Sequence, residues 1–155
     1  MICLLGVDLG TSGTKTVLFD AEGREVASQS VEYPLYQPQN GWAEQDPRDW
    51  WNAAVSTIRG VLEKSGVNPG DVKGLGISGQ MHGLVLLDES GEPLGRSLLW
   101  CDGRTQRECD EITQAVGEKR LIEIAANPAL TGFTAGKILW VRRHQPELFA
   151  RARHA

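Results

Sequence analysis

The chain has 155 residues, enough for one ordinary domain whose core needs neither disulfides nor a metal ion. Its formal net charge of -4 and its interspersed charges argue against a nucleic-acid-binding surface, and no apolar stretch approaches the length of a membrane span. Cys3, Cys101 and Cys109 form no Cys-x-x-Cys spacing, and an odd number of cysteines is typical of free thiols in a reducing compartment. These features predict a cytoplasmic protein with neither a nucleic acid nor a membrane as partner.

The first predicted element is a hairpin, with apolar runs over residues 2–7 and 16–19 around a turn rich in glycine and hydroxyl residues. Gly10 and Gly13 carry no Cβ, so the backbone N–H groups near them can converge on an anion. The other residues expected to contact phosphate in this turn are Thr11, Ser12, Thr14 and Lys15. An ordinary hairpin turn with the same composition stays open as an alternative.

Asp8 ends the first of these two strands, directly before the turn. A carboxylate at that point would repel a phosphate unless a divalent cation lay between them, and Mg²⁺ held largely through water is the simplest choice. The turn therefore predicts a site for a metal-bound polyphosphate. The stretch Asp8–Gly13 also resembles the first phosphate loop of the superfamily that contains sugar kinases, hexokinase and actin.

A third strand over residues 25–33 and a long helix follow the hairpin. Asp46 is a good N-cap, Pro47 suits the first helical position, and Gly66 is placed to end the helix. Apolar residues recur at three- and four-residue spacing and predict a stripe that packs on the sheet: Trp50, Trp51, Ala54, Ile58, Val61 and Leu62. At this spacing the two adjacent tryptophans indicate core packing rather than stacking on a ligand.

Residues 72–78 predict a buried strand that joins the sheet in parallel, because it follows a helix. The order strand-strand-strand-helix-strand predicts an α/β fold with a mixed sheet and flanking helices, as in a ribonuclease H-like lobe. Further on, the pattern predicts strands over residues 84–87 and 98–100, a helix over residues 102–116, and shorter helical segments to the end of the chain.

Two polar clusters follow predicted strands and are candidates for a polyol site. Gln80, Met81 and His82 combine hydrogen-bonding groups with a soft apolar surface in a glycine-lined turn, although a lone histidine there can equally serve local hydrogen bonding. Trp100 can pack on the C–H groups of a sugar while Asp102 accepts from its hydroxyls. Asp102 as the cap of the next helix is the alternative interpretation.

Four ordered segments together resemble the FGGY family of carbohydrate kinases, and within it the members that phosphorylate D-xylulose. They are residues 41–47 with the following tryptophan pair, residues 77–83, residues 99–105 and residues 132–140. The resemblance implies ATP-dependent formation of D-xylulose 5-phosphate, with Met81 and His82 contacting the ketose and Asp8 organising Mg²⁺ and phosphate. A kinase for another polyol, such as L-ribulose, L-fuculose or glycerol, and a non-catalytic nucleotide-binding module of the actin-like class stay open.

Members of this family are longer, two-lobed proteins. By resemblance, residues 1–155 correspond to the N-terminal portion of the first, sugar-binding lobe, and the second lobe of the same protein is a missing partner. The aspartate that serves as catalytic base is expected beyond residue 155. We therefore expect the isolated chain to be inactive and to expose apolar surface that favours self-association, for example as a homodimer.

Overall fold

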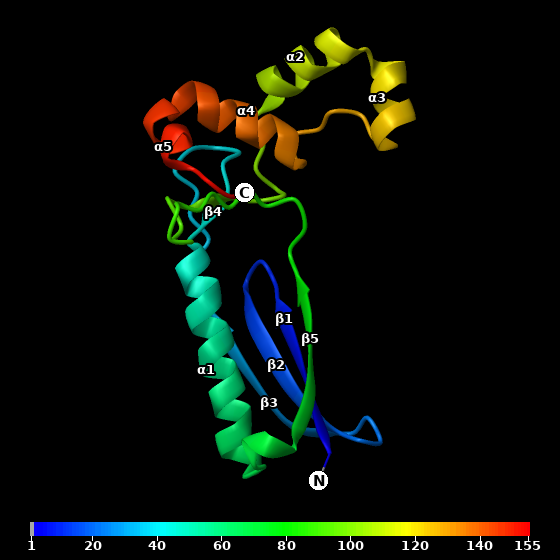
Figure 1. The fold of residues 1–155 in the computed structure, drawn as a ribbon, viewed down its shortest axis with the longest axis vertical. Coiled ribbons are helices and arrows are strands. Elements are labelled where there is room, and N and C mark those ends of the chain that lie inside the picture. The colour runs from blue at the N-terminus through cyan, green and yellow to red at the C-terminus, as the bar shows by residue number, and fades with distance from the viewer. Residues whose placement is uncertain (1) are drawn as a thin grey trace. The chain divides into compact units, whose positions relative to one another are not determined.

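A computed structural model describes residues 2–155 (Figure 1), and these residues form two compact units. The first unit comprises the residues up to Leu35 together with Arg48–Gln80, and the second comprises Tyr36–Pro47 and Met81–Ala155. Each unit has a hydrophobic cluster of its own.

The first unit is a four-stranded mixed sheet covered by one long helix. Its elements are β1 (Cys3–Leu9), β2 (Gly13–Asp20), β3 (Glu25–Glu32), α1 (Pro47–Ser65), a short 3₁₀ turn (Pro69–Asp71) and β5 (Val72–Gly79). The strand order is β3-β2-β1-β5, in which β1 pairs with β2 and β2 with β3 in antiparallel fashion, and β5 pairs with β1 in parallel. The predicted element order and the mixed sheet are confirmed.

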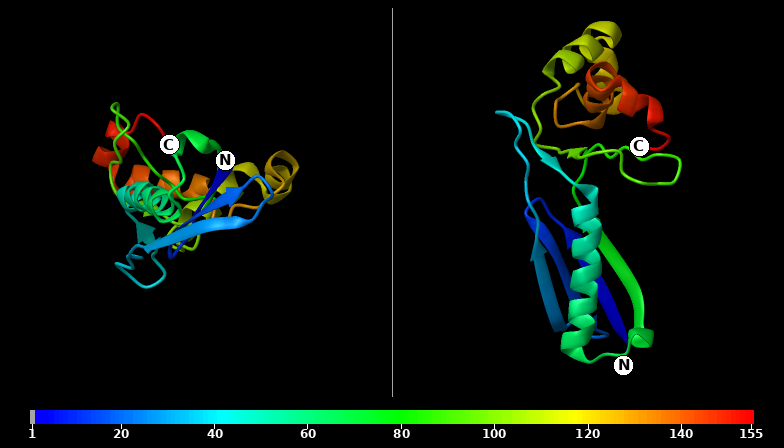
Figure 2. Two further views of the ribbon diagram at one scale, coloured as in Figure 1. Left: turned by 90° about the horizontal axis from the view of Figure 1, so that it is seen from below. Right: turned by 90° about the vertical axis from the view of Figure 1, so that its left-hand side faces the viewer.

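Helix α1 packs on one face of this sheet, as the right-hand view of Figure 2 shows. Val61 of α1 lies in a buried cluster with Cys3, Leu5 and Leu18, because alternate residues of a strand point to the same face. A buried hydrogen bond of 2.7 Å between the hydroxyls of Thr16 and Thr57 also joins the helix to the sheet.

The predicted ends of α1 are confirmed, but the predicted packing of its tryptophan pair is partly wrong. The helix begins at Pro47 and ends before Gly66, which has a φ of 65°. Its buried residues are Ala53, Thr57 and Val61, spaced four apart. Trp51 projects away from the sheet and is 72% exposed. A helix that approaches a sheet closely buries its small residues, and the bulky Trp51 lies outside that stripe.

Strand β5 is the edge strand of the sheet among the described residues, and the prediction that it is buried is wrong. Leu75 and Ile77 are 50% and 69% exposed, although their register partners Leu5 and Val7 on β1 are buried. Figures 1 and 2 show the reason, since β5 lies to one side of α1 rather than beneath it.

The second unit is mainly helical. Its elements are β4 (Glu44–Gln45), β6 (Ser97–Leu98), α2 (Gln106–Val116), α3 (Glu118–Ala125), α4 (Thr134–His144) and α5 (Pro146–Arg151). Helix α4 packs against both α2 and α5, and its residues Trp140 and Val141 form a core with Leu84 and Leu98. In the part of the chain that the structure describes, no helix is long and apolar enough to cross a membrane.

Two predicted elements of the second unit differ from the structure. Residues 84–87 make isolated bridges to Leu98, Pro93 and His154 instead of a continuous strand. Helix α2 begins at Gln106, four residues later than predicted, with Thr105 rather than Asp102 at the N-cap position. The predicted end at Gly117 is confirmed.

Candidate functional site

The predicted phosphate turn lies between β1 and β2 in the first unit. Asp8 is register partner to Lys15 on β2 and to Ser78 on β5. Paired residues of neighbouring strands point to the same face of a sheet, so these three exposed side chains share a face. This face is the one opposite α1. Val7 is buried on the face that α1 covers, and the next residue of a strand, Asp8, points to the other face. A carboxylate and an ammonium group beside a glycine turn suit a phosphate that carries a metal ion.

The backbone of this turn is held by hydrogen bonds at Gly10. The Gly10 N–H donates to the Gly13 carbonyl at 2.9 Å. The Gly10 carbonyl accepts from the Tyr33 hydroxyl at 2.6 Å and from the Gln80 side-chain amide at 3.1 Å. The Thr11 hydroxyl donates to the Gln80 amide oxygen at 3.4 Å. Gln80, predicted to contact sugar, thus uses its side chain to hold the phosphate turn.

Tyr33 was not identified from the sequence as a residue of the site. Its hydroxyl contacts the backbone of the turn at Gly10. Burial raises the pKa of Tyr33, and the negative charge of Asp8 adds a smaller rise, while a hydrogen bond from Thr14 acts in the opposite direction. The phenol therefore keeps its proton and donates it to the Gly10 carbonyl. The Thr14 hydroxyl is buried and directed to Tyr33 at 3.5 Å, which corrects the prediction that it serves as a donor to the ligand.

The residues present fit a magnesium ion that arrives with its phosphate rather than a pre-formed metal site. No group of three or more His, Cys, Asp or Glu side chains that could hold a metal occurs among residues 2–155. Asp8 offers one exposed carboxylate beside the turn. Mg²⁺ commonly keeps several waters and binds one or two carboxylates plus substrate phosphates, so a single aspartate suffices on this side.

The candidate sugar-contacting residues that lie in the second unit have exposed side chains. Met81 is 71% exposed and Trp100 is 50% exposed, while His82 is exposed and has a positive φ of 61°. The His82 ring packs edge-on against Phe133, with centroids 4.7 Å apart. Its backbone carbonyl accepts hydrogen bonds from the Lys137 ammonium at 2.9 Å and from the Thr134 hydroxyl at 3.3 Å.

Within this unit the structure brings the segments that carry His82 and Trp100 together around Gly132. A Cβ at Gly132 would lie 3.0 Å from the Trp100 carbonyl oxygen, so only glycine fits this approach without a shift. The Gly132 carbonyl accepts a hydrogen bond of 2.5 Å from Lys137, which also bonds the His82 carbonyl. Segments that are 18 and 32 residues apart in sequence, at His82, Trp100 and Gly132, thus meet just before α4.

Asp102 has a structural position, which corrects both predictions for its side chain. The residue is 1% exposed, and its carboxylate accepts from the Ala43 N–H at 2.7 Å and from the Arg104 guanidinium at 2.7–3.0 Å. Arg104 also pairs with Glu44 at 2.8 Å and lies over the Trp42 ring at 3.7 Å. With its oxygens engaged below the surface, Asp102 neither caps α2 nor presents its carboxylate to a sugar.

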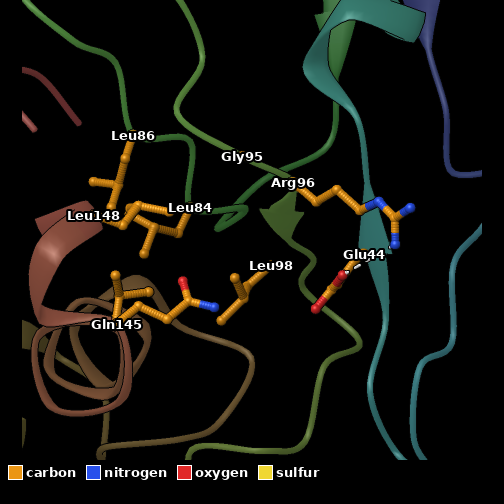
Figure 3. Close-up of a pocket in the computed structure, with 9 residues that line it drawn as sticks. Glu44, Leu84, Leu86, Gly95, Arg96, Leu98, Gln145 and Leu148 are labelled. Atoms are coloured by element: carbon orange, nitrogen blue, oxygen red, sulfur yellow. Dashed lines mark ion pairs between the residues drawn. The ribbon is translucent and has the colours of Figure 1, made fainter.

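Two cavities lie in the second unit. The first, of about 150 Å³, is lined by four leucines and by the Glu44–Arg96 ion pair, and Figure 3 shows these groups on opposite sides of it. None of the predicted site residues lines it. The second, of about 280 Å³, lies between α2, α3 and the start of α4, and His82 and Phe133 border it. Its walls are mostly apolar, which does not suit a polyol.

Comparison with known proteins decides the family. The N-terminal domain of the FGGY family of carbohydrate kinases matches residues 3–155. The chain belongs to this family. It is 42% identical to the xylulose kinase of Bacillus subtilis (strain 168) over 146 residues, which are 94% of this chain and 29% of that protein.

Solved structures of FGGY kinases share the fold of this chain. The xylulose kinase from Rhodospirillum rubrum superposes with a TM-score of 0.91 at 28% identity, over 97% of this chain and 31% of that one. The gluconate kinase from Lactobacillus acidophilus superposes with a TM-score of 0.87 at 30% identity, over 97% of this chain and 30% of that one. The present chain spans about 30% of the length of the FGGY relatives that it matches.

Proposed function

We propose that the whole protein carrying this chain transfers the γ-phosphoryl group of ATP to D-xylulose, with formation of D-xylulose 5-phosphate and ADP. The 42% identity to a curated xylulose kinase over 94% of the chain carries this proposal. The exposed side chains of Met81, His82 and Trp100 support it with groups suited to a ketose. The gluconate kinase neighbour makes another polyol the alternative substrate.

In the first unit, the phosphate turn would bind the metal-bound triphosphate. Backbone N–H groups near Gly10 and Gly13 and the hydroxyls of Thr11 and Ser12 would donate to phosphate oxygens, and Lys15 would neutralise part of their charge. When bound, Mg²⁺ would neutralise part of the charge on the phosphates. Asp8 would hold its water ligands, and this role requires the exposed position that the carboxylate has.

In the second unit, His82 and Met81 would orient the ketose. The imidazole can both donate and accept hydrogen bonds to hydroxyl groups, and the thioether and the Trp100 ring would cover C–H surface. Phosphoryl transfer depends mainly on positioning and charge stabilisation, so holding the attacking hydroxyl in line with the γ-phosphate is the contribution expected of this surface.

The group that takes the proton from the attacking hydroxyl would lie outside residues 1–155, by analogy with the family. We therefore expect these residues alone not to turn over ATP. A coupled assay of ADP release with D-xylulose and Mg-ATP tests this on the isolated chain and on the whole protein in parallel. Turnover by the isolated chain at a rate near that of the whole protein would contradict the assignment of the base.

The same assay tests the substrate. We expect kcat/KM of the whole protein to be at least about tenfold higher for D-xylulose than for L-ribulose, L-fuculose, gluconate or glycerol, the discrimination that a few polar contacts supply. A preference for another polyol would overturn the xylulose assignment. ADP release that no sugar stimulates would favour a nucleotide-binding module.

A matched pair of histidine variants tests the site. His82→Ala should raise the ketose KM by about tenfold or more, because a hydrogen-bonding partner of the sugar is lost. His154→Ala should leave kcat and KM unchanged, since His154 takes part in the fold through its backbone carbonyl and N–H. Equal kinetics for the two variants would contradict a sugar-contacting role for His82.

A further inference from the structure

We infer that Lys137 is a positioning residue for the sugar site, and that it acts by holding the backbone of His82 in the conformation that presents the imidazole. This inference rests on the proposed function for its kinetic consequence, but not for its structural one. It assigns a role to a buried charged side chain that the proposed phosphoryl transfer does not itself use.

The first observation is the complete burial of the Lys137 side chain. The residue is 0% exposed, and its ammonium nitrogen lies 2.9 Å from the His82 carbonyl oxygen and 2.5 Å from the Gly132 carbonyl oxygen. Burial lowers the pKa of Lys137, partly opposed by the charge of Asp102. A lysine is rarely buried without strong partners, and the two groups that accept hydrogen bonds from Lys137 are backbone carbonyls.

The second observation is the conformation of the residue that Lys137 bonds. His82 has a φ of 61°, in the left-handed region where a side chain with a Cβ is disfavoured. Such a conformation persists only where the surroundings impose it, and it is typical of functional sites. Lys137 and the Thr134 hydroxyl both donate to the carbonyl of His82, so two donors fix the orientation of the peptide that follows it.

The third observation is that one short segment supplies every contact just described. Residues 132–137 contribute the Gly132 carbonyl, the Phe133 ring against the imidazole, and the Thr134 and Lys137 donors. Gly132 in turn approaches the Trp100 carbonyl. Lys137 therefore bonds the backbone of His82 directly, and it also bonds the backbone of Gly132, which lies close to the Trp100 carbonyl.

Lys137→Met tests this role, because methionine keeps the length of the side chain and removes its donors. In the whole protein, we expect the ketose KM to rise about tenfold or more, as for a misplacement of about 1 Å, with the ATP KM changed by less than about twofold. Lys137→Arg, which keeps donors, should recover part of the affinity. Thr134→Val should raise the ketose KM by a smaller factor, and it provides the test if Lys137→Met does not fold.

Val141→Ala is the matched control on the same helix. Val141 is 2% exposed in the core, so its truncation should lower the melting temperature and leave the ketose KM unchanged. A ketose KM that rises equally in Val141→Ala and Lys137→Met would show that Lys137 acts through stability alone and would overturn the inference.

A measurement without substrate separates this inference from the proposed function. In spectra of the whole protein labelled with ¹⁵N-histidine, Lys137→Met should shift the ring resonances of His82 and leave those of His154 in place. That shift in a protein that phosphorylates no ketose would refute the proposed function and support the positioning role. Unchanged His82 resonances together with an unchanged ketose KM would refute the positioning role in an active kinase.

Discussion

Gly13→Ala provides a sharp test of how the phosphate turn is built. An added Cβ would lie 2.6 Å from the Val31 carbonyl oxygen and 3.1 Å from the Glu32 Cα, both backbone atoms of β3. No flexible side chain can relieve this overlap, so β2 and β3 must separate by several tenths of an ångström. Overpacking of this kind costs about 2 kcal/mol, which for a chain of this size lowers the melting temperature by about 4–8 °C.

The same substitution should weaken nucleotide binding, because Tyr33 directly follows Glu32 and its hydroxyl holds the Gly10 carbonyl. In the whole protein we expect the ATP KM to rise about tenfold, with the ketose KM within about twofold of wild type. Calorimetry and steady-state kinetics measure the two effects.

Gly76→Ala is the matched control for Gly13→Ala, since it adds the same methyl group to a strand of the same sheet. A Cβ there would meet the Leu5 carbonyl oxygen at 4.0 Å, an ordinary contact, so stability and ATP KM should stay close to wild type. If Gly13→Ala matched Gly76→Ala in both measurements, the proposed link from β3 through Tyr33 to the turn would be refuted.

Three further predictions concern stability and association. Tyr33→Phe should lower the free energy of unfolding by about 1–2 kcal/mol at pH 8, through loss of the bond to the Gly10 carbonyl. Because burial raises the folded-state pKa of Tyr33 above 10.0, this difference from wild type is present below pH 10 and shrinks as the pH rises through the folded-state pKa, which denaturation in urea measures. Asp102→Asn should destabilise the fold by about 3 kcal/mol in the same assay, because it leaves the buried Arg104 guanidinium with fewer partners. Leu75→Lys with Ile77→Lys should reduce self-association of residues 1–155 in light scattering, since lysines on an edge strand oppose pairing between copies.

Controls for these predictions come from the same chain. Glu111→Gln is the control for Asp102→Asn. It removes the charge of a carboxylate whose arginine partners are exposed to solvent, so it should change the free energy of unfolding little. Ile122→Lys adds one lysine at an exposed apolar position on α3, which is not part of the strand edge. If Ile122→Lys reduced association as strongly as the double substitution Leu75→Lys with Ile77→Lys, the association would come from exposed apolar surface in general rather than from pairing of strand edges.

The sequence predicted the elements whose signals are local. The ends of α1 followed from Pro47 and Gly66, and the parallel addition of β5 followed from the preceding helix. The wrong predictions concern burial, which depends on the elements that pack against a helix or strand. Helical spacing identified an apolar side of α1, but the closeness of the sheet selected Ala53 and Thr57 for burial and left Trp51 exposed. Whether β5 is central or at an edge depends on which strands flank it, and no pattern within Val72–Gly79 contains that information.

The candidate site shows the same division between local and distant signals. Glycine-rich turns after strands predict ligand contacts by Asp8, Met81 and His82; the structure exposes these side chains, and their contacts with a ligand stay predictions. Asp102 could not be placed, because a polar residue before a helix also suits a cap. Its burial depends on Arg104, which itself is held between Glu44 and the Trp42 ring, far away in the sequence.

In each unit, a backbone carbonyl at or near the candidate ligand-contacting residues accepts hydrogen bonds from two side chains that are distant in sequence. In the first unit, Tyr33 and Gln80 donate to the carbonyl of Gly10 in the phosphate turn. In the second, Thr134 and Lys137 donate to the carbonyl of His82. A carbonyl acceptor carries no residue-type signal, so these interactions cannot be found from the sequence. It follows that substitutions at such donors should change ligand affinity without touching the ligand, and that the exposed contact residues account for only part of the specificity.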